Sequence, residues 1–384
     1  MTSHTAHMRD STSTIAFVCP FTLLKQTGTP IRANLTIQVA SRFTQCHVIS
    51  LGGFEGERHH EIEEVWGTRR PTSRQFRVGV FTRKAARALA EIHPGIVHAF
   101  GPLGLLPALL YRRARRHPRL VLELHGLLAE EVSNHWPGGA LFHRLLDRLA
   151  VRRADAIIAM SHSQREILLR RYHVAPERVT VVWGPVDLDL FGYRKPAERE
   201  VFRVGYAGND GPWQGVEDLM AAAGSFREDT HITFRFIGIR SDRFPLPEGV
   251  SMDFFPGASR EETARLLGDC DVLLSPRRGK VAKTQYPFKL SAYLAVGRPV
   301  IATDVSDQRA ILEAADCGVV VSSESPDAMA EAIRRVRNLP HEQRVKMGWR
   351  GRRFAEEYLS IPRFQTALAR VYDSLSPGMA LSSL

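Results

Sequence analysis

The chain has 384 residues, of which 44% are hydrophobic and 24% are charged. This length suits two or three domains, and this composition excludes a disordered or fibrous protein. The formal net charge of +11 and the isoelectric point near 9.8 indicate anionic partners, with nucleotides, acidic lipid headgroups and nucleic acid all open.

The cysteines and the N-terminus bear on the compartment of the protein. Cys19, Cys46, Cys270 and Cys317 are isolated and form no C-x-x-C pair, so neither a zinc site nor a disulfide framework is indicated. We therefore expect a cytosolic protein. Residues 1–13 are polar, and no apolar run approaches the roughly 20 residues of a membrane span.

Strand-like and helix-like runs alternate from Thr14 onward, which predicts an α/β protein with parallel sheets and right-handed crossovers. In the first half we expect strands at residues 14–21, 46–52, 95–101, 119–126, 155–161 and 178–184. Helices are expected between them at residues 29–43, 73–92, 104–117, 140–154 and 163–174. These elements complete one doubly wound domain.

A second series of the same kind follows a polar, proline-containing linker at residues 193–200. Strands are expected at residues 201–208, 231–238, 250–257, 270–276, 298–304 and 317–321, with helices starting near Val216, Arg260, Pro287, Asp307 and Ser325. The helical run 341–374 contains Pro362, which should break or kink it. The expected parts are a flexible N-terminus (1–13), two Rossmann-like domains (14–192 and 201–358), a C-terminal helix (359–376) and a tail (377–384).

Two doubly wound domains place two sets of strand C-terminal ends opposite one another, so we expect the ligand in a central cleft. The strongest candidate site begins at Gln285. Pro287 suits the first turn of a helix, Gly297 can close that helix in a left-handed turn, and no acidic residue intervenes before Arg298. The free N–H groups of the first turn and Lys289 then favour an anion, although an ordinary crossover helix with a solvated lysine explains the same residues.

Three further motifs lie at expected strand ends. Gly28 and Thr29 open the first helix, His125 ends the strand 119–126, and glycines at 208, 211 and 215 shape the loop before the helix near Val216. A polar histidine at such a point can donate to a ligand hydroxyl or support developing charge. Ordinary strand-to-helix turns and a structural histidine are the alternatives.

A fourth motif is a basic loop after the strand 270–276, shortly before the candidate helix. It contains Arg277, Arg278, Lys280 and Lys283. Exposed runs of charge are usually solvated surface. This loop ends at the same sheet edge as the candidate anion site, so we expect it to supply most of the positive charge there.

Taken together, the motifs GTPIR, ELHG, ADAIIAMSHSQREILLRRY and VVWGPVDLDLF, with VGYAGNDGPWQGVEDLMAAA and PFKLSAYLAVGRPVIATDV, resemble the retaining family 4 glycosyltransferases of the GT-B fold. The resemblance runs from about Thr14 to Tyr372. It implies transfer of a sugar from a nucleotide-diphosphate donor, with retention at the anomeric carbon and without a metal or other cofactor. It also implies that the last helix crosses back onto the first domain.

The resemblance implies roles for particular residues. His125 would be catalytic and face the donor sugar. The donor-binding set would be Gly28, Thr29, Gly208, Asn209, Gln214, Gly215, Arg277, Lys280, Lys283, Tyr286, Pro287, Phe288, Lys289 and Leu290. Two glutamates that the family usually has are replaced by Thr284 and Ala292, and two cations of its glycine loop are replaced by Asn209 and Gln214.

Two function classes remain open on these departures. The first is an active glycosyltransferase acting on a glycan, lipid-linked or small-molecule acceptor, and the second is a catalytically impaired homologue that binds nucleotide sugars or serves as a scaffold. No aromatic-interleaved basic stripe indicates nucleic acid. The basic segments 105–120 and 144–153 suggest peripheral attachment to an anionic membrane, while solvated crossover helices are the alternative.

Overall fold

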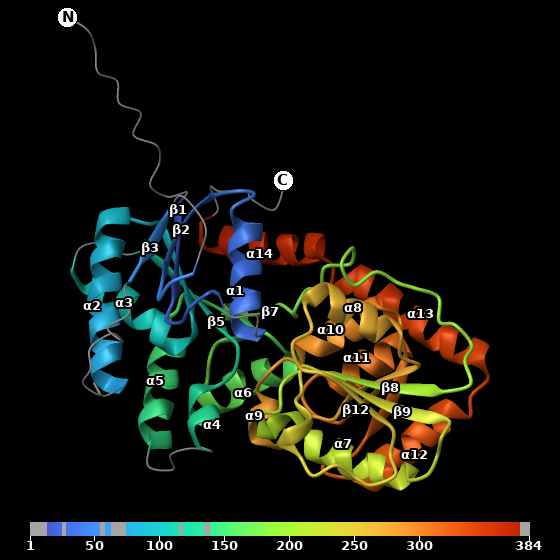
Figure 1. The fold of residues 1–384 in the computed structure, drawn as a ribbon. Helices are drawn as coiled ribbons and strands as arrows, with labels where there is room; N and C mark the ends of the chain where they lie inside the picture. Colours follow the sequence, from blue (N-terminus) through green and yellow to red (C-terminus); the bar gives the residue numbers. More distant parts are fainter. Residues whose placement is uncertain are drawn as a thin grey trace, which may run out of the picture. The chain divides into compact units, whose positions relative to one another are not determined.

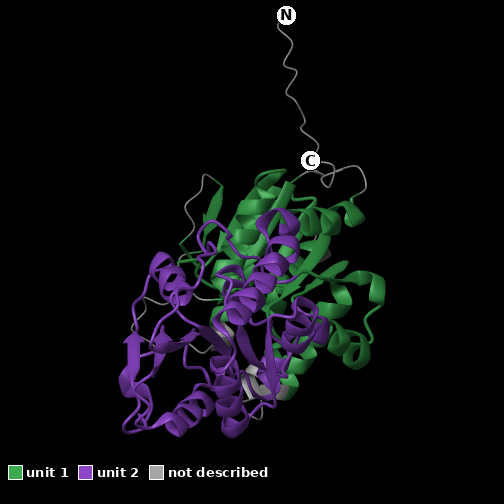
Figure 2. Ribbon diagram, turned by 90° about the vertical axis from the view of Figure 1, so that its right-hand side faces the viewer, with its two compact units in different colours: residues 1–160, 165–182, 365–384 green, residues 161–164, 183–364 purple. Residues whose placement is uncertain are grey.

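The computed structural model describes residues 14–24, 28–53, 58–62, 74–114, 118–133 and 139–376. The predicted N-terminal and C-terminal tails lie outside these residues, as do Lys25, Arg115 and Arg116. The chain forms two compact units (Figure 2): unit 1 is built from residues 1–160, 165–182 and 365–384, and unit 2 from residues 161–164 and 183–364. The predicted linker 193–200 contains no helix or strand and belongs to unit 2.

Unit 1 is built on a parallel sheet of seven strands in the order β3-β2-β1-β4-β5-β6-β7 (Figure 1). Its strands are β1 (Thr14–Cys19), β2 (Gln45–Ser50), β3 (His59–Glu61), β4 (Ile96–Phe100), β5 (Arg119–Leu124), β6 (Ala156–Ala159) and β7 (Val179–Val181). Its helices are α1 (Gly28–Ala40), α2 (Arg74–Ile92), α3 (Gly101–Ala114), α4 (Leu128–Ser133), α5 (Gly139–Arg153), α6 (His162–Tyr172), whose first three residues fall in unit 2, the 3₁₀ helix η3 (Pro176–Arg178), and most of α14 (Ile361–Leu375). The six predicted strands are confirmed.

Unit 2 has a parallel sheet of six strands in the order β10-β9-β8-β11-β12-β13. Its strands are β8 (Phe202–Ala207), β9 (Ile232–Ile237), β10 (Met252–Phe255), β11 (Val272–Ser275), β12 (Val300–Thr303) and β13 (Gly318–Val321). Its helices are α7 (Val216–Ala223), α8 (Arg260–Gly268), α9 (Gly279–Lys283), α10 (Phe288–Ala295), α11 (Gln308–Ala315), α12 (Pro326–Arg337) and α13 (His341–Tyr358), with 3₁₀ helices η4 (Pro212–Gln214), η5 (Gly224–Phe226) and η6 (Ser241–Arg243). All six predicted strands are confirmed here too.

The elements that the sequence did not predict are short. The edge strand β3 has only the polar residues His59, His60 and Glu61, which carry no apolar alternation, and α4 has one and a half turns. Residues Gly279–Lys283 were expected as loop but form α9, starting at Gly279, whose φ is +77°. Pro287 precedes α10 as its N-cap residue rather than occupying the first helical position.

Both sheets reverse their winding direction between a central pair of strands, β1 and β4 in unit 1 and β8 and β11 in unit 2. Ligands of open parallel sheets bind beyond the strand C-termini at such a reversal. Buried aliphatic and aromatic side chains fill both faces of each sheet, including Phe17, Ile49 and Leu122 in unit 1 and Phe234 and Leu274 in unit 2. The loops after β1, β5, β8 and β11 are therefore the places to look for chemistry.

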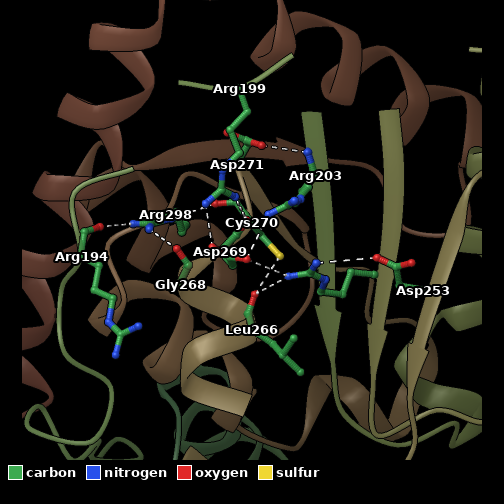
Figure 3. Close-up of polar contacts among 11 residues, drawn as sticks. Arg194, Arg199, Arg203, Asp253, Leu266, Gly268, Asp269, Cys270, Asp271 and Arg298 are labelled. Carbon is green, nitrogen blue, oxygen red and sulfur yellow. Dashed lines mark hydrogen bonds and ion pairs between the residues drawn. The ribbon is translucent and has the colours of Figure 1, made fainter. Parts of the chain in front are cut away.

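The end of α10 is fixed by one buried arginine (Figure 3). Gly297 has φ +68°, and a Cβ there would lie 2.4 Å from the ring of Tyr193, which confirms the predicted left-handed turn and requires glycine. The next residue, Arg298, is 1% exposed. Its guanidinium donates to the carbonyl oxygens of Gly268, Cys270 (2.8 Å), Arg194 (2.9 Å), Val296 (3.0 Å) and Gly297 (3.1 Å). These bonds satisfy carbonyl groups that the helix end leaves open.

Candidate active site

A buried charge cluster lies at the C-terminal ends of β4 and β5 in unit 1. Its centre is Glu123, whose carboxylate is fully buried. Arg32 of α1 donates through Nε to Glu123 Oε1 at 2.8 Å, and His98 Nε2 lies 3.2 Å from Oε2. His125 Nε2 lies 2.9 Å from Oε1. The cluster thus gives one buried carboxylate three basic neighbours.

The pKa shifts agree with this reading of the cluster. Burial alone would raise the pKa of Glu123, but Arg32 and the hydrogen bonds from both histidines hold it well below its usual range. Burial lowers the pKa of His98, so this ring is neutral. Its Nδ1 lies 2.8 Å from the hydroxyl of Tyr372, and its Nε2, although 3.2 Å from Glu123 Oε2, makes no hydrogen bond of good geometry among the described residues. Tyr372 lies on α14, so this C-terminal helix completes the cluster within unit 1.

The cluster fixes how His125 can act. Because the Glu123 carboxylate accepts, His125 Nε2 carries the hydrogen of that bond, and in the neutral ring Nδ1 is a bare acceptor. This Nδ1 is buried and has no hydrogen-bond partner among the described residues. We predicted that His125 donates to a ligand hydroxyl or supports developing charge, and this role stays a prediction. The edge of Phe100 packs against the ring at 5.7 Å and limits its rotation.

The glycine loop of unit 2 begins at Gly208, directly after β8. Gly208 has φ +148°, and a Cβ there would lie 3.0 Å from Lys289 Nζ. Gly215, with φ +69°, leaves no space at all, because its Cβ would lie 1.5 Å from the carbonyl oxygen of Pro276. Between them, the Asn209 carbonyl accepts from the Tyr206 hydroxyl at 2.7 Å, and the buried Gln214 Oε1 has no hydrogen-bond partner in the part of the chain that the structure describes. The positive φ favours glycine at 208, and the Pro276 backbone requires it at 215.

Lys289 is a basic residue of unit 2 whose side-chain nitrogen is buried. The residue is partly exposed along its stem, but its ammonium nitrogen is buried and has no hydrogen-bond partner among the described residues. It lies 3.9 Å from the centre of the Tyr206 ring, which attracts it without neutralising it. Burial, with a contribution from Arg277, lowers the pKa of Lys289 well below its usual value. A buried cation without an anion is costly, so this position suits a negatively charged ligand.

Arg277 provides a second buried cation nearby. It is 3% exposed, and burial lowers its pKa to about 10. Its guanidinium donates only to neutral oxygens: the carbonyls of Tyr286 (3.4 Å) and Ala282 (3.5 Å) and the side chain of Gln285 (3.3 Å). Its Nε has no partner among the described residues. Arg277 and Lys289 are two basic side chains of unit 2 with buried nitrogen atoms, and neither forms an ion pair within the described part of the chain.

The other predicted cations behave differently. Arg278 donates to Asp218 at 2.9 Å and to Glu217, both in the first turn of α7, and to the Pro212 carbonyl at 3.2 Å. Its charge is thus already balanced, and the two carboxylates also oppose an anion at the start of α7. Lys280 and Lys283 are exposed on α9. Two members of the predicted basic loop therefore lie in solvent and a third is neutralised.

The remaining predicted residues border α10 and α1. Tyr286 is buried and its hydroxyl lies 2.8 Å from Ser291 Oγ, while the rings of Tyr286 and Phe288 meet edge to face at 5.7 Å. Leu290 is fully buried in the first turn of α10, which has no acidic residue and no side-chain cap after Pro287. In unit 1, Gly28 and Thr29 form the first turn of α1, one turn before Arg32.

The two positions at which the resemblance expects glutamates supply no charge. Thr284 is buried, and its hydroxyl donates to the Val281 carbonyl at 3.0 Å. Ala292 is partly exposed on α10. Sequence reasoning missed the partners of Glu123, because Arg32, His98 and Tyr372 come from three elements far apart in the chain. It also missed Asp307, whose carboxylate accepts from the N–H groups of His162 (2.7 Å) and Ser163 (2.9 Å) and from the Trp183 indole (2.9 Å) within unit 2.

Comparison with known proteins decides the family. The profile described as Glycosyltransferase Family 4 matches residues 33–190, and that of Glycosyl transferases group 1 matches residues 201–338. The chain belongs to the family 4 glycosyltransferases. A curated relative, D-inositol 3-phosphate glycosyltransferase 1 of Catenulispora acidiphila, is 28% identical over 290 residues, which cover 67% of this chain and 66% of the relative.

Solved structures share the GT-B fold with this chain. Sucrose-phosphate synthase from Thermosynechococcus elongatus superposes with a TM-score of 0.78 at 17% identity, covering 95% of this chain and 100% of that one. HepE from Anabaena, solved in complex with UDP-glucose, superposes with a TM-score of 0.72 at 16% identity, covering 94% of this chain and 99% of that one. The predicted GT-B fold is confirmed. At these identities the likeness extends to the fold alone.

Proposed function

We propose that this protein transfers a sugar from a nucleotide-diphosphate sugar to a glycan, lipid-linked or small-molecule acceptor, with retention of anomeric configuration and without a bound metal. In this reaction the bond between the anomeric carbon and the diphosphate oxygen breaks. A bond from that carbon to an acceptor oxygen forms, and the proton of the acceptor hydroxyl passes to the departing diphosphate. Family membership supports the reaction class, and the UDP-glucose complex of the HepE structure supports a nucleotide sugar as donor.

The observation that carries the proposal is the uncompensated Lys289 ammonium beside Gly208. The leaving diphosphate gains negative charge as its bond to the sugar breaks. A lysine held in place there stabilises that charge once it is protonated, and one such contact contributes about 3–4 kcal/mol in comparable sites. Arg277 adds charge from the loop after β11, and the uncapped start of α10 adds N–H groups. Together they form the proposed diphosphate site.

In unit 1, the proposed contact with the sugar is His125. Its free Nδ1 accepts a hydrogen bond from a sugar hydroxyl, while Glu123 holds the ring through Nε2. Glu123 and Arg32 are positioning residues in this proposal, since neither is exposed to a ligand. The proposed role of His125 is to orient the sugar and to disperse positive charge that develops on it.

Thr284 and Ala292 favour a second candidate, a homologue that binds nucleotide sugars without turning them over. Where the family usually has two carboxylates, this chain has a hydroxyl already bonded to Val281 and a methyl group. Such a protein would keep the diphosphate site and lose part of the hydroxyl recognition. It would act as a binding or scaffold partner.

Calorimetry followed by a transfer assay separates these candidates. We expect a nucleoside diphosphate to bind the parent protein, and Lys289→Ala to weaken that binding by about 10- to 100-fold, the effect of losing a hydrogen bond to a charged group. Lys283→Ala is the matched control, because its lysine is exposed. Equal affinity of Lys289→Ala and the parent would contradict the diphosphate site. Binding without transfer or hydrolysis for a panel of donor sugars would favour the second candidate.

We also propose a cytoplasmic location with peripheral attachment to the inner face of the membrane. Among the described residues, no helix combines the length and the apolar character that a bilayer crossing needs.

A further inference from the structure

Helix α5 of unit 1 exposes an apolar stripe. The exposed fractions are 67% for Leu141, 58% for Leu145 and 37% for Leu149, and the neighbouring Phe142 is 54% exposed. The three leucines are spaced by four residues and so lie along one side of the helix. Another exposed leucine, Leu110, lies on α3, which packs against α5. These side chains make up much of the exposed large apolar surface of the described residues.

The opposite side of α5 shows that this exposure is built into the fold. His143 and Asp147 point inward and are buried, with Ala150 and Val151 packed in the core. The Asp147 carboxylate accepts from the N–H groups of Leu128 and Ala129 at 3.3 and 3.0 Å and so holds the start of α4. Two polar residues of this helix, His143 and Asp147, therefore face the interior, while the leucines face outward. An ordinary crossover helix has the reverse arrangement.

A row of arginines accompanies the leucines. Arg144, Arg148 and Arg152 are also spaced by four residues, and Arg153 follows. All four are exposed, and none of their side chains has an ion-pair or hydrogen-bond partner among the described residues. Since Leu141 and Arg144 are three residues apart, the two rows are offset by about 60° around the helix axis. The outer face of α5 is thus apolar along one strip and cationic along the next.

The segment 105–120, which the sequence suggested for membrane attachment, is less suitable. Arg112 and Arg119 lie 3.5 and 3.9 Å from the single carboxylate of Asp155, which offsets part of their charge. Arg115 and Arg116 lie outside the described residues. Of that segment, Leu110 adds to the exposed surface next to α5.

We propose that the outer face of α5 docks onto an anionic lipid bilayer, with the helix lying in the plane of the interface. Leu141, Phe142, Leu145 and Leu149 would enter the boundary between headgroups and acyl chains, and the arginines would contact the lipid phosphates. This inference names the partner for the attachment stated under the proposed function, but it does not depend on turnover. Charge complementarity selects the lipid, because the face is positive and apolar and has no exposed acid of its own.

A second copy of this chain fits the face less well. A two-fold contact would place the same row of arginines against itself, with no carboxylate on α5 exposed to balance it. An anionic bilayer offers both an apolar layer and a dense layer of phosphates at the spacing of headgroup and acyl chain. The observed pairing of an apolar strip with a cationic strip matches that layering.

The proposal is tested by co-sedimentation of the full chain with phosphatidylcholine vesicles that contain increasing phosphatidylglycerol. We expect binding to rise with phosphatidylglycerol and to fall with salt. The variant L141Q/L145Q/L149Q should bind at least tenfold more weakly, and its matched control L246Q, an exposed leucine in unit 2, should bind like the parent. The variant R144Q/R148Q/R152Q should lose about fivefold per arginine. Its control is R260Q/R335Q/K346Q, which removes the same charge from exposed positions in unit 2.

Three results would overturn the proposal. The first is absence of binding by the parent even at low salt, and the second is equal losses in the α5 variants and their controls. The third is a parent that is dimeric by sedimentation velocity while L141Q/L145Q/L149Q is monomeric, because the face would then join two copies of the chain. Nucleoside-diphosphate affinity and transfer to a soluble acceptor are measured on the same variants and should be unchanged. Failure of lipid docking is therefore distinguishable from failure of the proposed transferase activity.

Discussion

The two units differ in whether their buried charged side chains have partners of opposite charge. In unit 1, the Glu123 carboxylate is surrounded by Arg32, His98 and His125, and the cluster is closed by the protein itself. In unit 2, the ammonium nitrogen of Lys289 and the guanidinium of Arg277 are buried near one another. Neither contacts a carboxylate of the described residues. A closed cluster positions side chains for a ligand, whereas an open one attracts the ligand's own charge. In the proposed function, this difference corresponds to orientation of the sugar by unit 1 and binding of the diphosphate by unit 2.

The largest expected effect comes from removing the carboxylate charge of Glu123 from its cluster. Glu123→Gln leaves the buried guanidinium of Arg32 without its carboxylate, and breaking a buried pair in this way costs about 3–5 kcal/mol of folding free energy. We expect this loss in urea unfolding monitored by circular dichroism. The double variant Arg32→Met with Glu123→Leu removes both charges and should recover most of the stability. A double variant as unstable as the single one would show that the pair does not act as a unit.

The next effect concerns what the closed cluster positions. His125→Ala removes the free Nδ1 acceptor, and we expect turnover to fall by about 100-fold, within the range of a positioned catalytic side chain. Affinity for the free nucleotide should stay near that of the parent, because Lys289 and Arg277 remain in unit 2. Steady-state kinetics and calorimetry on the same preparation check both parts. A large loss of nucleotide affinity would instead make His125 a structural residue.

A smaller expected effect is the uptake of a proton by Lys289 when a diphosphate binds. Burial depresses the pKa of Lys289 in the free protein, and a bound diphosphate should raise it again by favouring the charged form. Binding then takes up a proton, and affinity falls with rising pH between the two pKa values, by at most about tenfold per pH unit. Without ligand the sign for stability is opposite: the unfolded state holds the proton more tightly, so stability rises with pH between the folded and unfolded pKa values.

Calorimetry in buffers of different ionisation enthalpy measures this uptake directly. The parent and Lys283→Met should take up the proton, because Lys283 is exposed and its variant keeps Lys289. Lys289→Met should not. Identical uptake by Lys289→Met and the parent would place the titrating group elsewhere and would remove the main support for the diphosphate site.

The sequence predicted the elements around the site better than the site itself. Strand β12 and helix α10 follow from short-range signals, an apolar run and the left-handed Gly297, which act over a few residues. Glu123 depends on contacts that the sequence does not display: its bond to Arg32 spans 91 positions, and the bond from His98 to Tyr372 spans 274. Burial also separates neighbours that look alike. Arg277 is buried and unbalanced, while Arg278 is balanced by acids on α7 about 60 positions earlier.

That contrast between adjacent arginines gives the smallest expected effect and the sharpest check on the comparison. Arg278→Gln should change nucleoside-diphosphate affinity by less than about threefold, because Asp218 and Glu217 already occupy its guanidinium. The loss should appear instead as a modest decrease in stability, since burial raises the pKa of Asp218 and Arg278 opposes that shift. Titration calorimetry measures the affinity, with Lys289→Ala as the comparison, and scanning calorimetry measures the stability. A tenfold loss of affinity in Arg278→Gln would mean that Arg278 leaves Asp218 and Glu217 to bind the ligand. An arginine in an ion pair would then still be available for binding, and the comparison between Arg277 and Arg278 would fail.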